Sequence, residues 1–197
     1  LDKTSFYKIS KDVFSKHITN EILILDDNLS SSDIFENIDD FKIYYVKFKD
    51  SKIHIEDRGL QFADSVYEVV AIVNKNLKNL KFHLKRLRFS LGELKIDYKV
   101  QDVELTKIFK RLINDNLIID GIIYLQITRG VQERDHVYKK NLKPTVIIYS
   151  RKKKFNLSTK LKGVKVITHQ DLRWARKDIK TVNLLPNILA ENSSWSF

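Results

Sequence analysis

The feature that most constrains the fold is a leucine repeat in the middle of the chain. The spacing between successive members is four or three residues: Leu80, Leu84, Leu87, Leu91 and Leu94. This spacing places all five side chains on one face of an α-helix. The segment is therefore predicted to be an amphipathic helix that packs its leucine face on a core.

The same helix carries a second set of large side chains. Phe82, Arg86 and Phe89 fall on the side opposite the leucines, so the helix is predicted to be packed on both sides. Arg86 would then be partly buried, and an unpaired buried charge is costly. Arg86 is thus expected to have an anionic partner, for which an ordinary ion pair within the chain is the more common explanation.

Runs of β-branched and apolar residues surround this helix. They predict strands over residues 43–46, 53–55, 66–73, 121–128, 145–149 and 164–168, the first two joined by a polar turn. A second helix is predicted from about Val103 to Asn116, with Leu105, Ile108 and Leu112 inward, and a further helix-like segment covers residues 182–190. Strands and helices in mixed order favour an α+β architecture.

Composition excludes several classes of protein. Hydrophobic residues make up 43% of the chain, which is enough to bury a core. The absence of cysteine excludes a disulfide scaffold, a thiolate metal site and a cysteine nucleophile. The five histidines show no close helical zinc spacing, and glycine-rich phosphate loops and the GxSxG elbow are absent. No metal site is therefore expected.

The net charge of +11 raises the alternative of a nucleic-acid-binding protein. The basic run at residues 151–154 has no interleaved aromatic residues, which favours a solvated face and no specific nucleic-acid binding. No apolar stretch is long enough to span a bilayer, and the first residues lack the pattern of a signal peptide. We therefore expect a cytoplasmic protein without a membrane partner.

Five blocks of the sequence resemble class IV aminotransferases, the fold-type-IV enzymes that use pyridoxal phosphate. In chain order they are EDRGLQFADSVYEV (56–69), HLKRL (83–87), YLQITRG (124–130), DLRW (171–174) and DIKTVNLL (178–185). The resemblance covers about residues 41–190. Residues 129–136 (RGVQERDH) are similar to the corresponding segment of D-amino acid (D-alanine) aminotransferases. Branched-chain aminotransferases and aminodeoxychorismate lyases, which remain alternatives, carry different residues there.

The resemblance implies a fold and an activity. The fold is α+β and fold-type-IV aminotransferase-like: an N-terminal extension (1–40), an essentially complete N-terminal α/β domain (41–145) and an incomplete second, cofactor-binding domain (146–197). The activity implied is amino transfer between D-amino acids and 2-oxo acids with pyridoxal 5'-phosphate as cofactor, in a homodimer.

Site residues follow from the resemblance position by position. Lys180 matches the lysine that condenses with the cofactor aldehyde and then moves the α-proton. Arg86 matches the arginine that binds the cofactor phosphate, which would also supply the anionic partner it needs. Tyr67 matches an active-site tyrosine, and Arg134 and His136 match the pair that binds the substrate α-carboxylate from the dimer partner.

Some residues depart from the family pattern. Leu60, Ala63 and Ser65 replace tyrosine, glycine and glycine in the first block, and an added side chain at a glycine position is expected to cost about 1 kcal/mol. Pro186 falls inside the helix expected after Lys180, where it is predicted to cause a kink. Arg173 is a further residue that the resemblance brings near the lysine.

Length is the larger departure. Few residues follow Lys180, and the last seven, from Glu191 to Phe197, resemble nothing in the family. We therefore expect a chain cut short in its second domain, without the acidic partner of the cofactor ring and without part of the phosphate site. Such a chain is expected to have impaired activity or, as the rival interpretation, to be an inactive remnant.

Overall fold

The computed structural model describes residues 21–25, 35–38, 41–155, 161–163 and 166–193. Predictions that concern the remaining residues lie outside this part of the chain. They include most of the predicted N-terminal extension, the first two residues of the expected strand 164–168, and the last four residues of the unfamiliar tail.

One seven-stranded sheet organises the described part of the chain, with strand order β2-β3-β1-β7-β6-β4-β5. Its strands are β1 (Glu21–Leu25), β2 (Phe35–Ile38), β3 (Phe41–Val46), β4 (Ser65–Val73), β5 (Asn76–Leu77), β6 (Gly121–Thr128) and β7 (Val146–Lys152). Strand β1 runs parallel to β3 and β7, and all other neighbours are antiparallel. The helices with described bounds are η1 (Phe48–Asp50), α2 (Arg58–Phe62), α3 (Leu80–Leu94), α4 (Asp102–Asp115) and α6 (Leu185–Ser193).

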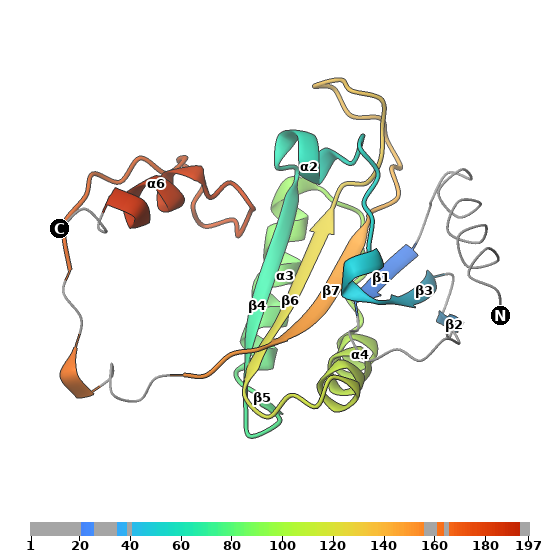
Figure 1. Cartoon of the computed structure of the whole chain (residues 1–197). Coiled ribbons are helices and arrows are strands. Elements are labelled where there is room, and N and C mark those ends of the chain that lie inside the picture. Colours follow the sequence, from blue (N-terminus) through green and yellow to red (C-terminus); the bar gives the residue numbers. More distant parts are fainter. Residues whose placement is uncertain (1–20, 26–34, 39–40, 156–160, 164–165, 194–197) are drawn as a thin grey trace.

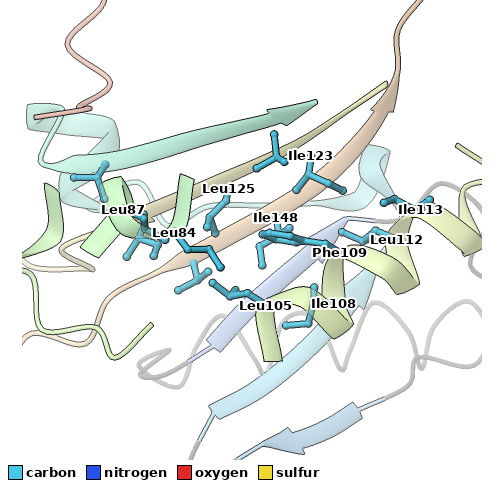
Figure 2. Packing of buried hydrophobic residues seen from close by; sticks show 14 of the residues in the cluster. Leu84, Leu87, Leu105, Ile108, Phe109, Leu112, Ile113, Ile123, Leu125 and Ile148 are labelled. Carbon is cyan, nitrogen blue, oxygen red and sulfur yellow. The ribbon is translucent and has the colours of Figure 1, made fainter. Parts of the chain in front are cut away.

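The core lies between one face of the sheet and the helices α3 and α4 (Figures 1 and 2). Alternate residues of a strand point to the same face, so β4, β6 and β7 each present every second side chain to these helices. The inward residues of these strands include Val66, Val70, Ile72, Ile123, Leu125, Ile127, Val146 and Ile148. They pack against Leu84, Leu87 and Leu91 of α3 and Leu105, Ile108, Phe109 and Leu112 of α4.

The opposite face of the sheet carries a row of half-buried tyrosines. Tyr67 of β4 stacks on Tyr124 of β6, with ring centroids 5.9 Å apart, and Tyr124 stacks on Tyr149 of β7 at 4.9 Å. Burial raises the pKa of Tyr124 to about 12, so its hydroxyl stays protonated and donates to the Gln126 side chain at 2.9 Å. This row makes the second face partly aromatic and partly polar.

The structure confirms the α+β architecture and most of the predicted elements. Helix α3 has the bounds of the leucine repeat, and α4 buries Leu105, Ile108 and Leu112 as expected. Strands β4, β6 and β7 are close to the predicted ranges. Between β4 and β5, Asn74 and Lys75 both have positive φ angles of 49° and 61°, as a two-residue hairpin turn requires.

The predicted strands at residues 53–55 and 164–168 are wrong where the structure describes them. Residues 53–55 and 166–168 are not in any strand, and Ile55 and Val166 are largely exposed. Short apolar runs fit a strand locally, but no strand among the described residues pairs with these two. Conversely, two segments for which no strand was predicted, residues 21–25 and 35–38, form β1 and β2.

The second packed face predicted for α3 is also wrong among the described residues. Phe82 is 70% exposed and Phe89 47% exposed, because β4 contacts α3 on its leucine side. The predicted anionic partner of Arg86 does exist, and it is a carboxylate of this chain, Glu68.

Two expectations about single residues have different outcomes. Ala63 ends α2 with a φ angle of 56°, so the alanine does occupy a left-handed position that glycine would adopt more easily. Pro186 is the second residue of α6, where the backbone N–H groups have no partner within the helix. The predicted kink is therefore wrong, since proline is tolerated in a first helical turn. No helix in the described part of the chain has the length and apolar character needed to cross a membrane.

Candidate functional site

Strand β4 and helix α3 together position most of the predicted site residues. Neighbouring residues of a strand point to opposite faces, so Tyr67 lies on the open face of the sheet and Glu68 on the face covered by α3. Helix α3 contributes Arg86 and, one turn later, Ser90. One helical turn is about 5–6 Å, so side chains from these two elements meet within a small region.

Glu68 fixes the side chain of Arg86. Glu68 is 1% exposed, and its carboxylate accepts hydrogen bonds from Arg86 Nε at 2.7 Å and from a terminal nitrogen of Arg86 at 2.6 Å. His83 Nδ1 lies 2.7 Å from the same carboxylate, so this nitrogen carries the proton that it donates. The hydrogen bonds with Glu68 raise the pKa of Arg86, which keeps the guanidinium charged.

Arg86 retains donors for a further anion. A guanidinium has five N–H donors, of which Glu68 takes two, and 46% of the Arg86 side chain is exposed. Glu68 thus holds the inner edge of the guanidinium while the outer edge faces solvent. This arrangement suits bidentate binding of a phosphate, for which an oriented guanidinium is well matched.

The backbone of Lys180 is docked on the same two elements. The Lys180 amide N–H donates to Ser90 Oγ at 3.1 Å, and its carbonyl accepts from the Tyr67 N–H at 3.0 Å. Thr181 next to it forms an antiparallel bridge with Val66, at the edge of β4 that β5 leaves uncovered. Lys180 and Thr181 therefore lie at this edge of the sheet, beside β4 (Figure 1).

The side chain of Lys180 lies against Tyr67. Lys180 Nζ is 4.2 Å from the centroid of the Tyr67 ring, a distance typical of a cation–π contact. Lys180 is half-buried, whereas the adjacent Ile179 and Thr181 are buried. The amine is thus placed by its buried neighbours and remains accessible to a ligand.

Arg173 is not brought to this group. Its guanidinium pairs with Asp171 at 2.9 Å, and that hydrogen bond raises the pKa of Arg173. Asp171 also accepts from Lys177 at 2.7 Å, and Arg176 pairs with both Asp178 and Glu93 of α3. These are exposed ion pairs, which order the segment before Lys180 and contribute little stability.

Arg134 and His136 lie in a separate place, beside α2. Arg134 donates to the Gln61 side chain at 3.2 Å, and the ring of Phe62 contacts both Arg134 and His136. Arg134 and His136 are both exposed. Within the described ranges, no hydrogen bond, ion pair or ring contact joins them to the Lys180 group.

No sequence pattern given above indicates a role for Glu68 or Ser90. Glu68 had a usable signal, since it is the one charged residue in the strand SVYEVVAIV and a charge there must be paired if the strand is buried. Ser90 had none, because a serine in a helix is ordinarily exposed or bonded to its own helix. Its acceptor role follows only from the docking of residues 179–181.

Comparisons with known proteins show what this chain is similar to. A family model described as amino-transferase class IV matches residues 65–194. A D-alanine aminotransferase of Bacillus licheniformis is 41% identical over 142 residues, which are 72% of this chain and 50% of that protein. A D-alanine aminotransferase of Listeria monocytogenes is 38% identical over 154 residues, which are 77% of this chain and 53% of that protein.

The fold has solved relatives as well. The crystal structure of 4-amino-4-deoxychorismate lyase from Pseudomonas aeruginosa has a TM-score of 0.58 and 22% identity, and the match covers 72% of this chain and 53% of that one. A likeness at this identity concerns the fold alone. The chain spans about half the length of the D-alanine aminotransferases that it matches.

Proposed function

Because the chain belongs to the class IV amino-transferase family, we propose that it binds pyridoxal 5'-phosphate and serves amino transfer between D-amino acids and 2-oxo acids. The observation that carries the proposal is the joint docking of Lys180 and Arg86 on β4 and α3. The backbone of Lys180 is bonded to Ser90, one helical turn after Arg86 on α3, so an amine that can condense with an aldehyde and a guanidinium that can bind a phosphate belong to the same part of the fold.

The residues present fit the cofactor at its two ends. Arg86 would bind the phosphate through the donors on its outer edge, since Glu68 occupies the inner edge. Lys180 would hold the aldehyde carbon covalently through Nζ. When bound, pyridoxal phosphate supplies the group that carries the amine and the ring that spreads the negative charge of the α-carbon.

Lys180 has a second task in this proposal. Its Nζ would also take the proton from the substrate α-carbon, as a general base. Tyr67 supports this by covering one side of the amine at 4.2 Å, which restricts the directions from which Nζ can approach the α-carbon. The Ser90 and Tyr67 hydrogen bonds hold the lysine backbone in place during the transfer.

We further propose that Arg134 and His136 bind the substrate α-carboxylate. Both side chains are exposed and carry N–H donors, and an arginine with a neighbouring histidine suits a carboxylate. Their separation from the Lys180 group supports the expectation that they act on the site of a second copy, in a homodimer. Identities of 34–41% with D-alanine aminotransferases support D-amino acids as substrates. A cytoplasmic location stays a prediction from the sequence.

Cofactor binding is tested by titrating the purified chain with pyridoxal phosphate and following visible absorbance. We expect a Lys180-dependent band that appears at lower concentrations of pyridoxal phosphate than of pyridoxal, since only the former offers a phosphate to Arg86. Lys180→Ala should abolish the band, and Arg86→Gln should remove the difference between the two compounds. Equal binding of both compounds by the wild-type chain would contradict the role of Arg86.

Substrate class is tested by the first chemical step, which is detectable even when turnover is slow. With pyridoxal phosphate in deuterated water, we expect the α-hydrogen of D-alanine to exchange, detected by NMR, and that of L-alanine to remain. Lys180→Ala should stop the exchange. Exchange of L-branched amino acids instead would favour a branched-chain aminotransferase relative, and no Lys180-dependent exchange would favour an inactive relative.

A further inference from the structure

Beside α2, arginine and aromatic side chains alternate in a stack of five. The guanidinium carbon of Arg129 lies 3.8 Å from the ring centroid of Tyr138, and the guanidinium carbon of Arg58 lies 5.7 Å from the same centroid. Arg58 is also 4.7 Å from the ring of Phe62, and Arg134 is 4.6 Å from the same ring. We name this set, Arg129, Tyr138, Arg58, Phe62 and Arg134, the arginine–aromatic column.

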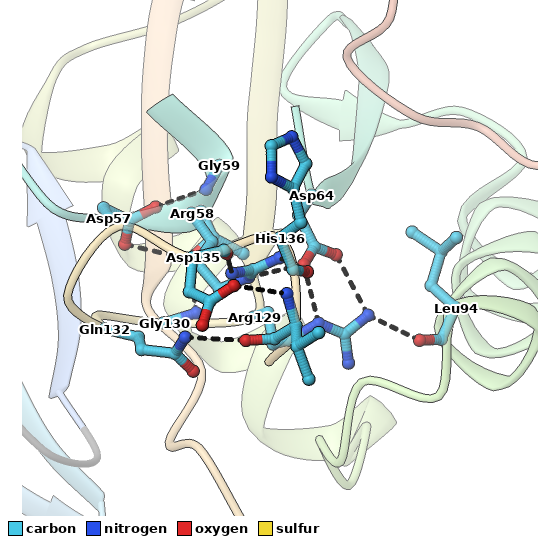
Figure 3. Close-up of polar contacts among 12 residues, drawn as sticks. Asp57, Arg58, Gly59, Asp64, Leu94, Arg129, Gly130, Gln132, Asp135 and His136 are labelled. Carbon is cyan, nitrogen blue, oxygen red and sulfur yellow. Dashed lines mark hydrogen bonds and ion pairs between the residues drawn. The ribbon is translucent and has the colours of Figure 1, made fainter. Parts of the chain in front are cut away.

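The inner end of the column is held by buried ionic hydrogen bonds (Figure 3). Asp64 accepts from Arg58 Nε at 2.9 Å and from Arg129 at 2.7 and 2.9 Å. Arg129 also donates to the carbonyls of Leu94 at 2.7 Å and Lys95 at 3.0 Å, which end helix α3. Arg58 is 4% exposed and Arg129 7% exposed, so both cations are fixed by partners rather than by water.

The outer end of the column contacts the loop that carries the carboxylate-binding pair. Arg58 donates to the backbone carbonyl of Asp135 at 2.6 Å and to that of His136 at 3.3 Å. The ring of Phe62 lies 5.4 Å from the imidazole of His136 and 4.6 Å from the guanidinium of Arg134. Phe62 is therefore the one side chain in the described structure that makes ring contacts with both members of the pair.

We propose that Phe62, itself held by Arg58, is a positioning residue that orders Arg134 and His136 for a substrate carboxylate. This inference rests on the carboxylate-binding role given to the pair under the proposed function. An exposed arginine would otherwise lose substantial side-chain freedom on binding a ligand. A ring that contacts the guanidinium and the imidazole beforehand removes part of that cost, which increases affinity for the carboxylate.

The first measurement reports the geometry without a ligand. A ring next to an imidazole shifts its carbon-bound proton resonances, so the His136 signals in an NMR spectrum serve as a signature of the contact with Phe62. We expect Phe62→Leu to move these signals toward ordinary positions and Phe62→Tyr to preserve them. Phe48→Leu is the matched control, because Phe48 contacts Arg151 at 5.3 Å elsewhere in the fold, and it should leave His136 unchanged.

The second measurement reports binding. The His136 signals of the wild-type chain are titrated with propionate and with propionamide, which has the same shape without the charge. We expect the wild-type chain to bind propionate and Arg134→Gln to abolish this binding. Phe62→Leu should weaken the affinity for propionate about fivefold, whereas Phe62→Tyr should keep it within about twofold of the wild-type value. A fivefold loss corresponds to about 1 kcal/mol.

The outcomes separate the two proposals. If Phe62→Leu binds propionate as tightly as the wild-type chain does, the column is structural only and the inference is wrong, whatever happens to the His136 signals. If the wild-type chain does not distinguish propionate from propionamide, the carboxylate-binding role of Arg134 and His136 fails first, and the positioning role fails with it. Restoration by Phe62→Tyr excludes general unfolding as the cause of the loss.

Discussion

Replacing Glu68 with glutamine should destabilise the fold through the loss of one buried ionic cluster. The carboxylate accepts three short contacts, from two nitrogens of Arg86 and from His83. Glutamine keeps one acceptor oxygen, but its NH₂ group replaces the second carboxylate oxygen and would face the N–H donors that this oxygen accepts. A hydrogen bond to a charged group contributes about 1.5–3 kcal/mol, and the half-exposed Arg86 recovers part of the loss through water. We therefore expect Glu68→Gln to lower the free energy of unfolding by about 2–3 kcal/mol.

The assay is urea unfolding followed by circular dichroism, with Asp102→Asn as the matched control. Asp102 pairs with Arg88 on the same helix α3, but both side chains of that pair are about half exposed, 49% and 45%. Exposed pairs contribute about 0–1 kcal/mol, so the control should change stability little. If Glu68→Gln costs no more than Asp102→Asn, the reasoning that Glu68 is a buried anchor for Arg86 is refuted.

Three further predictions concern stability and use the same assay. Ala63→Gly should stabilise the chain by about 1 kcal/mol because position 63 has a φ angle of 56°, while the control Ala71→Gly in β4 should destabilise it. A destabilising Ala63→Gly would refute the left-handed conformation of residue 63. Gly130→Ala should lower the free energy of unfolding by about 3 kcal/mol or more, since its φ angle is 104° and an added Cβ would collide with a backbone carbonyl. Gly163→Ala, at a φ angle of 73° with open space around it, should lower it less, and equal losses would contradict the collision. Burial raises the pKa of Asp57 above 3.8, so folding favours the protonated carboxyl. The contribution of this protonation to the free energy of unfolding is fully present below the unfolded-state pKa and is lost as pH rises through the higher folded-state pKa. The stability of the wild-type chain minus that of Asp57→Asn should therefore fall with rising pH in that window, and a rise would show that the pKa is lowered instead.

Periodicity predicted the elements whose burial is set locally. The leucine repeat from Leu80 to Leu94 and the β-branched run of β4 specify their structure because one face of each packs on the common core. The same reasoning failed for residues 53–55, where a short apolar run fits a strand but no described strand lies beside it. It also failed for Phe82 and Phe89, since apolar side chains on a helix do not show which face is covered.

The candidate site could be predicted only in part. Family blocks indicated Lys180, Arg86 and Tyr67, and the structure brings these residues together on β4 and α3. Sequence could not show that Glu68 holds Arg86 or that Ser90 holds the lysine backbone, because these contacts join residues 18 and 90 positions apart. Such contacts depend on how the segment beyond β7 docks on the sheet edge, which no local pattern specifies.

The most direct test of the central claim is to find which lysine captures the cofactor. The purified chain is incubated with a small excess of pyridoxal phosphate, reduced with borohydride to make the bond permanent, and digested for mass spectrometry. We expect modification to concentrate on Lys180, and Arg86→Gln to lower it there while leaving exposed lysines such as Lys81 at their background level. Modification spread evenly over the exposed lysines, with Lys180 no more reactive than Lys81, would contradict the claim that β4 and α3 form a cofactor site.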